Sequence, residues 1–233
     1  MLEKRAYTRV LQGVLDIADA IFPVGTYGRS IDHLGRMHLY RDGMNFGHGV
    51  GFVSNASFDV NYSFAFSFRH GIGHFLSVHE GPQRIGSRYS PYEEPLAEGM
   101  FLSDEPGFYK PGDFGIRIEN DMEVIKTNTS VYDGEQFLGF NTITYVPYER
   151  SLIDVSLLSS AHYDAINRYH AKIAETLEPY LKGDQAALNA LRSRTAKLDP
   201  QVPTSTRKLS NSTYLTVGSP LLIFLTLLLY LIF

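Results

Sequence analysis

Two glycine–histidine segments stand out in the first third of the chain. Residues 47–51 read Gly-His-Gly-Val-Gly, residues 70–74 read His-Gly-Ile-Gly-His, and another histidine follows at position 79. Glycine lets the backbone approach a bound group closely and adopt positive φ. Imidazole binds transition metals and transfers protons near neutral pH. The segments are therefore candidates for a metal or proton-transfer site, although each histidine taken alone could be an ordinary loop residue.

Two glutamates farther along strengthen the metal interpretation. Glu105 lies in Ser-Asp-Glu-Pro-Gly, and Glu119 has apolar neighbours in Gly-Ile-Arg-Ile-Glu-Asn. A carboxylate inside an apolar strand is costly to bury unless it is paired or bound to a metal. A salt bridge to Arg117 is the simpler alternative for Glu119. Imidazoles together with bridging carboxylates suit manganese, zinc or cobalt, and two such ions can activate a shared water.

The pattern of apolar residues predicts an α+β fold. Apolar positions recur at helical spacing in four segments, and Asp184 is a plausible cap for the last of them. Short apolar runs divided by Pro-Gly pairs predict strands. The expected helices cover residues 3–22, 30–40, 156–180 and 184–198, and the expected strands cover 99–103, 114–119, 121–126 and 137–147.

Composition excludes several classes of function. The formal net charge of the 233 residues is −4 and no run of lysine or arginine occurs, so nucleic acid is not an expected partner. The chain has no cysteine, which excludes disulfides, thiolate metal sites and cysteine nucleophiles.

The carboxy-terminal residues predict membrane attachment. Residues 221–233 form an apolar run that ends the chain, and residues 199–220 read as a stalk and spacer with small residues at 210–212. Small residues, a spacer and an apolar tail are typical of a GPI-anchor signal. We therefore expect a membrane-anchored protein at the cell surface. A tail-anchoring helix and a soluble, cytoplasmic protein are the alternatives.

Three motifs resemble the signatures of one enzyme family, in order and in spacing. They are His-Glu-Gly-Pro at 79–82, Asp-Glu-Pro-Gly-Phe-Tyr at 104–109 and Gly-Ile-Arg-Ile-Glu-Asn at 115–120. With their surroundings they resemble the Xaa-Pro aminopeptidases (aminopeptidase P), which are metallopeptidases. The resemblance covers residues 3–198 apart from 52–69. It implies a partial pita-bread (creatinase/aminopeptidase-like) domain over residues 1–198 and removal of the amino-terminal residue from peptides with proline second. It also implies a homodimer in the full-length form.

The resemblance also implies site residues. His70, Glu105 and Glu119 match ligands of two divalent metal ions, manganese or zinc, and Glu105 also matches the general base. His48 and His79 match the substrate-binding and proton-handling histidines of the family.

The choice of histidine ligand rests on distance along the chain. The family places this ligand nine residues before the histidine of the His-Glu-Gly-Pro motif, and His70 is nine residues before His79. His74 then falls at a non-catalytic position. Residues 52–69 interrupt the pattern, and we expect a retained intron there, with a genuine inserted loop as the alternative.

A second departure concerns the metal site itself. The family supplies two aspartate ligands from a strand upstream of residue 3, whereas Asp16 and Asp19 lie within the expected first helix and are poor substitutes. We therefore expect an enzyme fragment that is inactive alone. The alternative is a non-catalytic pita-bread module that binds peptides or proteins at the membrane surface, and an unrelated metal hydrolase is a more distant one.

Overall fold

The computed structural model describes residues 1–50, 72, 82–129 and 134–199. The expected insertion at 52–69 and the apolar run at 221–233 lie outside these residues, as does all of 200–220. Among the described residues, no helix is both long and apolar enough to cross a membrane.

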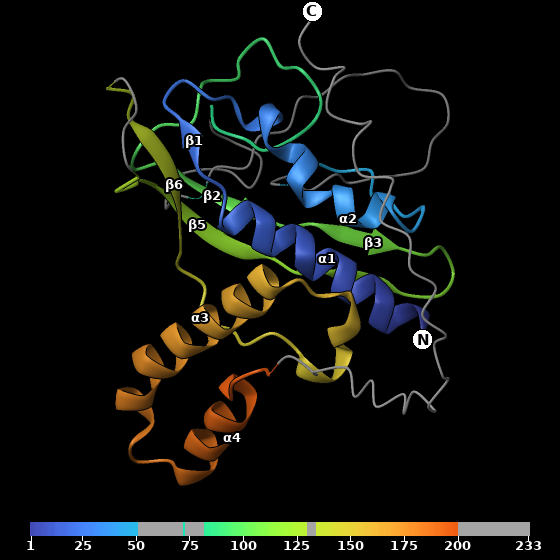
Figure 1. Cartoon of the computed structure of the whole chain (residues 1–233), viewed down its shortest axis with the longest axis vertical. Helices are drawn as coiled ribbons and strands as arrows, with labels where there is room; N and C mark the ends of the chain where they lie inside the picture. Colours follow the sequence, from blue (N-terminus) through green and yellow to red (C-terminus); the bar gives the residue numbers. More distant parts are fainter. Residues whose placement is uncertain (51–71, 73–81, 130–133, 200–233) are drawn as a thin grey trace, which may run out of the picture. The chain divides into compact units, whose positions relative to one another are not determined.

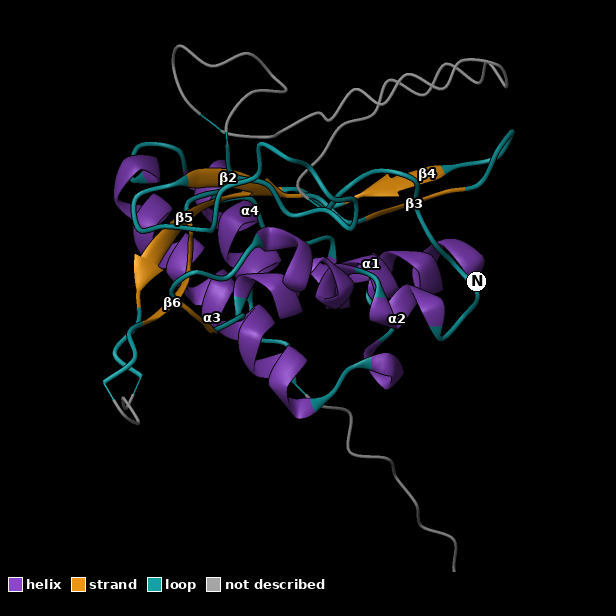
Figure 2. Ribbon diagram, turned by 90° about the horizontal axis from the view of Figure 1, so that it is seen from above, coloured by secondary structure: helices purple, strands orange, loops and turns teal. Residues whose placement is uncertain are grey.

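Helix α1 (Leu2–Ala18) is the centre of the described fold. Its apolar residues divide between two cores. Val10 and Ile17 belong to the core shared with the strands, whereas Leu11 and Val14 belong to the core shared with α3 (Ser160–Leu177). Figure 1 shows α1 running across the strands, and Figure 2 shows the helices on one side of them.

The strands form one four-stranded sheet and one hairpin. The sheet has the antiparallel order β1-β6-β5-β2, and β3 pairs with β4 in the hairpin. The strands are β1 (Phe22–Pro23), β2 (Phe101–Asp104), β3 (Gly107–Tyr109), β4 (Gly115–Arg117), β5 (Asn120–Lys126) and β6 (Phe137–Thr142). The mixture of helices and antiparallel strands confirms the α+β prediction.

The first helix is shorter than predicted. It ends at Ala18, and Phe22 instead pairs with Leu138 of β6 and packs its ring 5.2 Å from that of Phe140. Ile21, which fitted the helical apolar pattern, is 57% exposed. Burial of Phe22 in the sheet therefore decides where the chain leaves the helix.

The predicted helix over residues 30–40 is wrong for most of its length. The chain forms the 3-10 turns η1 (Gly28–Ser30) and η2 (Asp32–Gly35) and then the single-turn helix α2 (Met37–Tyr40). Gly35 lies so close to α1 that a Cβ on Gly13 would be 2.5 Å from the Gly35 carbonyl oxygen. This close approach of two backbones replaces the regular helix.

The helices after the sheet follow the prediction more closely. The segment expected at 156–180 consists of η4 (Val155–Leu157), α3 and η5 (Glu178–Leu181), and it is preceded by η3 (Arg150–Leu152). Helix α4 (Gln185–Thr195) begins after Asp184, whose Oδ1 accepts the backbone N–H of Ala187 at 2.9 Å. The predicted cap is confirmed.

Candidate metal centre

Glu105 follows the last residue of β2 and is completely buried. Its Oε1 accepts a hydrogen bond from Ser103 Oγ at 2.9 Å, and its Oε2 lies 3.3 Å from Nη1 of Arg117. The β3–β4 hairpin pairs Gly107 with Arg117, which brings the guanidinium back to Glu105. Two neighbouring side chains therefore fix the orientation of this carboxylate.

Asp104 is a second buried carboxyl, which the sequence analysis did not select. It is 0% exposed, and neither of its carboxyl oxygens has a hydrogen-bond partner in the described part of the chain. Burial, and then the charges of Glu105 and Glu119, raise its pKa well above the usual value. Its place beside Glu105 in the Asp-Glu-Pro-Gly motif was the only sequence signal that could have identified it.

Glu119 lies in the connection between β4 and β5, and not inside a strand as predicted. The register of the sheet pairs Asp104 with Asn120, so Glu119 lies near the end of β2. The prediction of a buried residue was wrong, because Glu119 is exposed as a whole. Protein atoms still remove enough water from its carboxyl to raise the pKa. The alternative of an Arg117 partner holds in part: the guanidinium charge reaches Glu119 and opposes the rise in its pKa, but the close ion pair of Arg117 is with Glu105.

His48 is buried and held at both ring nitrogens. Its Nδ1 lies 2.7 Å from the carbonyl oxygen of Gly49, and its Nε2 lies 2.9 Å from the hydroxyl of Tyr109. Because a carbonyl oxygen only accepts, Nδ1 carries the proton and Nε2 accepts the Tyr109 O–H. The same phenolic oxygen accepts a bond from Arg117 Nε at 2.8 Å. Burial lowers the pKa of His48 to about 4, so the ring is neutral at pH 7.

The hairpin thus joins two of the predicted site residues. Arg117 contacts the carboxylate of Glu105 and the hydroxyl of Tyr109, and Tyr109 contacts His48. Tyr109 lies in the same motif as Glu105, but the motif alone does not predict this connection to His48. His70 and His79, together with His74, lie outside the described residues, so their predicted roles remain predictions.

The described carboxyl groups fit a divalent cation. Asp104 and Glu105 are fully buried, and Glu119 adds a third carboxyl whose charge reaches Asp104. Among the described side chains, the Arg117 guanidinium is the positive group that contacts Glu105, at 3.3 Å. Asp104 has no hydrogen bond in the described part of the chain. Carboxylate oxygens suit divalent ions such as manganese, and a histidine nearby would extend the range to zinc.

Comparison with known proteins assigns nearly all of the described chain. Residues 2–126 match the model of metallopeptidase family M24, and residues 136–198 match that of the C-terminal region of peptidase M24. The chain is 42% identical over 194 residues to a probable Xaa-Pro aminopeptidase P of Arthroderma otae, covering 83% of this chain and 28% of that protein. A probable Xaa-Pro aminopeptidase P of Laccaria bicolor is 42% identical over 197 residues, with 84% and 28% covered.

A solved structure agrees with the sequence relatives. The X-prolyl aminopeptidase of Caenorhabditis elegans, described as a cytosolic enzyme with a di-nuclear active site, superposes with a TM-score of 0.71 at 33% identity. The match covers 84% of this chain and 29% of the nematode protein, so the chain spans less than a third of the length of these relatives. The described helices and antiparallel strands are the corresponding part of the pita-bread fold. The chain belongs to metallopeptidase family M24.

Proposed function

We propose that this chain is part of an aminopeptidase that removes the amino-terminal residue from peptides with proline in second position. The observation that carries the proposal is the buried Asp104–Glu105 pair at the end of β2, with Glu119 beside it, in a chain 42% identical to probable Xaa-Pro aminopeptidases P. A bound cation would stabilise these neighbouring carboxyl groups, of which Asp104 has no hydrogen bond in the described part of the chain.

We assign Glu105 and Glu119, with His70, as ligands for two divalent metal ions, manganese or zinc. Two such ions, when bound, would lower the pKa of a water and polarise the scissile carbonyl. The di-nuclear site named for the nematode relative supports this number. Ser103 and Arg117 orient the Glu105 carboxylate, which leaves it fixed for proton acceptance as the general base.

The neutral His48 ring supports a role in binding substrate or handling protons. Its Nε2 carries a lone pair at pH 7, because Nδ1 donates to the Gly49 carbonyl. It therefore accepts a proton or hydrogen bond rather than donating one. In the described structure the Tyr109 hydroxyl donates a hydrogen bond to this nitrogen, and a substrate N–H could take its place. We also propose that His79 binds substrate or handles protons together with His48, and this assignment rests on the family resemblance alone.

We further propose that the 233-residue chain has little activity by itself. It spans 28% of the length of its curated relatives, so most residues of those proteins have no counterpart in it. Asp16, in α1, and Asp19, the residue that follows this helix, both form contacts away from the Glu105 site. Asp16 contacts His38 and His162, and Asp19 pairs with Arg168 at 2.6 Å. Neither is therefore a substitute ligand for the Glu105 site.

Membrane attachment and dimer formation remain part of the proposal. The composition of residues 199–233 supports a GPI anchor, or a tail helix, at the cell surface. The cytosolic location stated for the nematode relative supports the alternative of a soluble protein. A homodimer would belong to the full-length form.

A chimeric protein tests this proposal, because a relative can supply the amino-terminal residues that this chain lacks. The amino-terminal part of the Arthroderma otae protein is joined to this chain at residue 2, with residues 52–69 present in one version and deleted in another. Release of the first residue from Ala-Pro-Ala and Ala-Ala-Ala is followed by mass spectrometry with Mn²⁺ or Zn²⁺. Glu105→Gln tests the site, and exposed Glu98→Gln is the matched control.

We expect metal-dependent release from Ala-Pro-Ala, strongest in the deleted version. Glu105→Gln should reduce it by roughly 100-fold or more, because a ligand and a general base are lost together, while Glu98→Gln should not. Equal cleavage of both peptides, or an unaffected Glu105→Gln protein, would refute the proposal. A folded protein that binds Ala-Pro-Ala without cleaving it would favour the non-catalytic binding module.

A further inference from the structure

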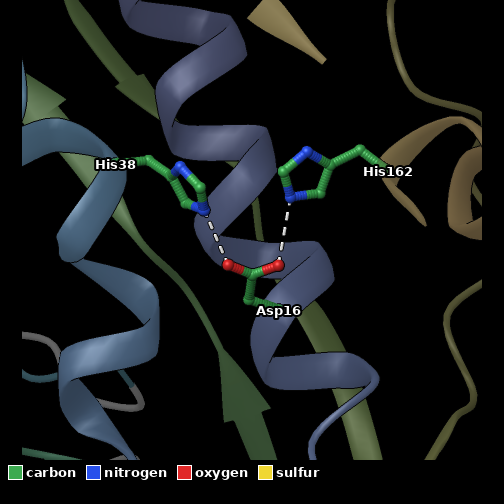
Figure 3. Close-up of side chains that lie close together, drawn as sticks. All are labelled: Asp16, His38 and His162. Carbon is green, nitrogen blue, oxygen red and sulfur yellow. Dashed lines mark hydrogen bonds and ion pairs between the residues drawn. The ribbon is translucent and has the colours of Figure 1, made fainter. Parts of the chain in front are cut away.

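Three helices bring one aspartate and two histidines together away from the Glu105 site. Asp16 lies in the last turn of α1, His38 lies in α2, and His162 lies in the first turn of α3. Asp16 Oδ2 is 2.6 Å from His38 Nε2, and Asp16 Oδ1 is 3.1 Å from His162 Nε2. Figure 3 shows both rings pointing at the same carboxylate.

The cluster is protected from solvent, and both oxygens of its carboxylate face imidazole nitrogens. The side chains of His38 and His162 are 6% and 8% exposed, and that of Asp16 is 22% exposed. Although burial raises the pKa of the Asp16 carboxyl, the bonds from His162 and His38 outweigh this effect and leave the pKa below its usual value.

Hydrogen bonding leaves one part of the cluster unexplained. The buried Nδ1 of His38 has no hydrogen-bond partner in the described part of the chain. Buried polar atoms are rarely left without a partner. Among the described residues no hydrogen bond at Nδ1 holds the proton on Nε2 of His38, so Nδ1 can carry it when Nε2 binds a metal.

We propose that Asp16, His38 and His162 form a second metal site, which binds a Zn²⁺-type transition metal through the carboxylate and the two Nε2 atoms. The three donor atoms lie within 4.8 Å of one another. Two imidazoles and one carboxylate are a common ligand set for zinc, which binds nitrogen and oxygen at about 2.0–2.2 Å. The ion would take the place of the two Nε2 protons that now bond to Asp16.

The surroundings of His162 allow the tautomer that zinc needs. Its Nδ1 lies 3.0 Å from Ser159 Oγ, 3.2 Å from the Ser159 backbone nitrogen and 3.3 Å from Nε2 of Gln12. Without metal, Nδ1 accepts the backbone N–H, and Nε2 donates to Asp16. With metal on Nε2, the proton moves to Nδ1 and Ser159 Oγ can accept it. The Ser159 N–H and the Gln12 amide then lose this acceptor, although Gln12 keeps its bond to the Leu157 carbonyl. Ligating histidines usually have such an acceptor on the other nitrogen.

A cleft gives access to the cluster. A cavity of about 440 Å³ is lined by Asp16 and His162, by the second carboxylate Asp19, and by apolar residues that include Ile31 and Leu34. Zinc with three protein ligands has a fourth position for water or another oxygen ligand, and this cleft could hold it. Because the three ligands come from α1, α2 and α3, the bound ion would tie together helices that are far apart in the sequence.

The test uses Zn²⁺ as the probe and removes the carboxylates of the other site. The untagged full chain carrying Glu105→Gln and Glu119→Gln is loaded with Zn²⁺ and desalted, and bound zinc is measured by mass spectrometry. His38→Gln is then added, with His33→Gln as the matched control, because His33 is an exposed histidine in the neighbouring turn η2. The thermal midpoint of each protein is recorded with and without Zn²⁺.

We expect His38→Gln to lower the bound zinc by about one ion per chain relative to His33→Gln. It should also abolish a zinc-induced rise in Tm of several degrees. Asp16→Asn, which keeps the shape of the side chain, should give the same loss if His38→Gln folds poorly. Equal zinc and equal Tm shifts in the His38→Gln, Asp16→Asn and His33→Gln proteins would overturn the proposal and leave a purely hydrogen-bonded cluster.

Discussion

Lowering the pH from 7 to 5 should destabilise the protein through His170, a buried imidazole on α3. His170 is 1% exposed, and its Nε2 accepts the backbone N–H of Tyr148 at 3.2 Å. Protonation of Nε2 would break this bond and place a charge in the core beside the stacked rings of Tyr148 and Tyr169. Burial accordingly lowers the pKa of His170 to about 4.

The size of the effect follows from the difference in pKa between the two states. An unfolded histidine has a pKa of about 6.5. Between pH 6.5 and pH 4 the unfolded chain binds more protons than the folded chain, so stability falls as the pH falls through this window. His170 should therefore remove about 2 kcal/mol from the free energy of unfolding between pH 7 and pH 5, and about 3 kcal/mol by pH 4.

Urea unfolding at pH 7 and pH 5 in a metal-free buffer measures this difference. In His170→Gln, which does not titrate, the loss of stability between the two pH values should be smaller by about 2 kcal/mol. Exposed His33→Gln should keep the original pH dependence. Because only the change with pH is compared, any loss at pH 7 from the substitution itself cancels. The reasoning fails if His170→Gln and His33→Gln lose the same stability on acidification.

Three further substitutions test local features of the structure. Tyr109→Phe removes the hydroxyl that donates to neutral His48, so the pKa of His48 should rise from about 4 by roughly one unit in an NMR titration; an unchanged value would contradict the assigned tautomer. Gly13→Ala should cost about 1–3 kcal/mol in urea unfolding despite the better helix propensity of alanine, because its Cβ would be 2.5 Å from the Gly35 carbonyl; a stabilised variant would show that the backbones separate easily. Asp184→Ala should cost about 1 kcal/mol by loss of the α4 cap, whereas no change would mean that α4 contributes little to global stability.

Local signals in the sequence predicted much of this fold. Apolar residues recur at helical spacing in α1 and α3 because the same side of each helix is buried over successive turns. Asp184 caps α4 through a bond to a residue only three positions away. The motif around Glu105 was identified through its resemblance to the Xaa-Pro aminopeptidases, and the strands β2, β3 and β4 that carry it are close in the sequence.

Features set by distant pairing could not be predicted in the same way. Strand β1 exists because Phe22 pairs with Leu138, more than a hundred residues away, and the apolar pattern alone extends the helix through that position. Strand β3 was missed because its Gly107 follows a proline and read as a break. The chain near Gly35 was read as helix because its close approach to α1 leaves no mark in the local pattern.

The Glu105 site and the Asp16–His38–His162 cluster also differ in how far local sequence could predict them. Glu105 and His48 could be selected from motifs, but the burial of Asp104 and the exposure of Glu119 depend on the strand register. Asp16 and His38 meet His162 only through the packing of three helices, so residues dispersed along the chain gave no spacing to recognise.

The central claim is that Glu105 and Glu119 bind a divalent metal, and a Mn²⁺ titration of the thermal midpoint tests it most directly. The full chain carrying His38→Gln, which disables the second cluster, is compared with the same protein carrying Glu105→Gln and Glu119→Gln. A control with Glu98→Gln and Glu123→Gln keeps the number of charges equal. We predict that increasing Mn²⁺ raises Tm by a few degrees in the parent and the control, and not in the Glu105→Gln/Glu119→Gln protein. The same rise in all three proteins, or no rise in any, would contradict the assignment of this site.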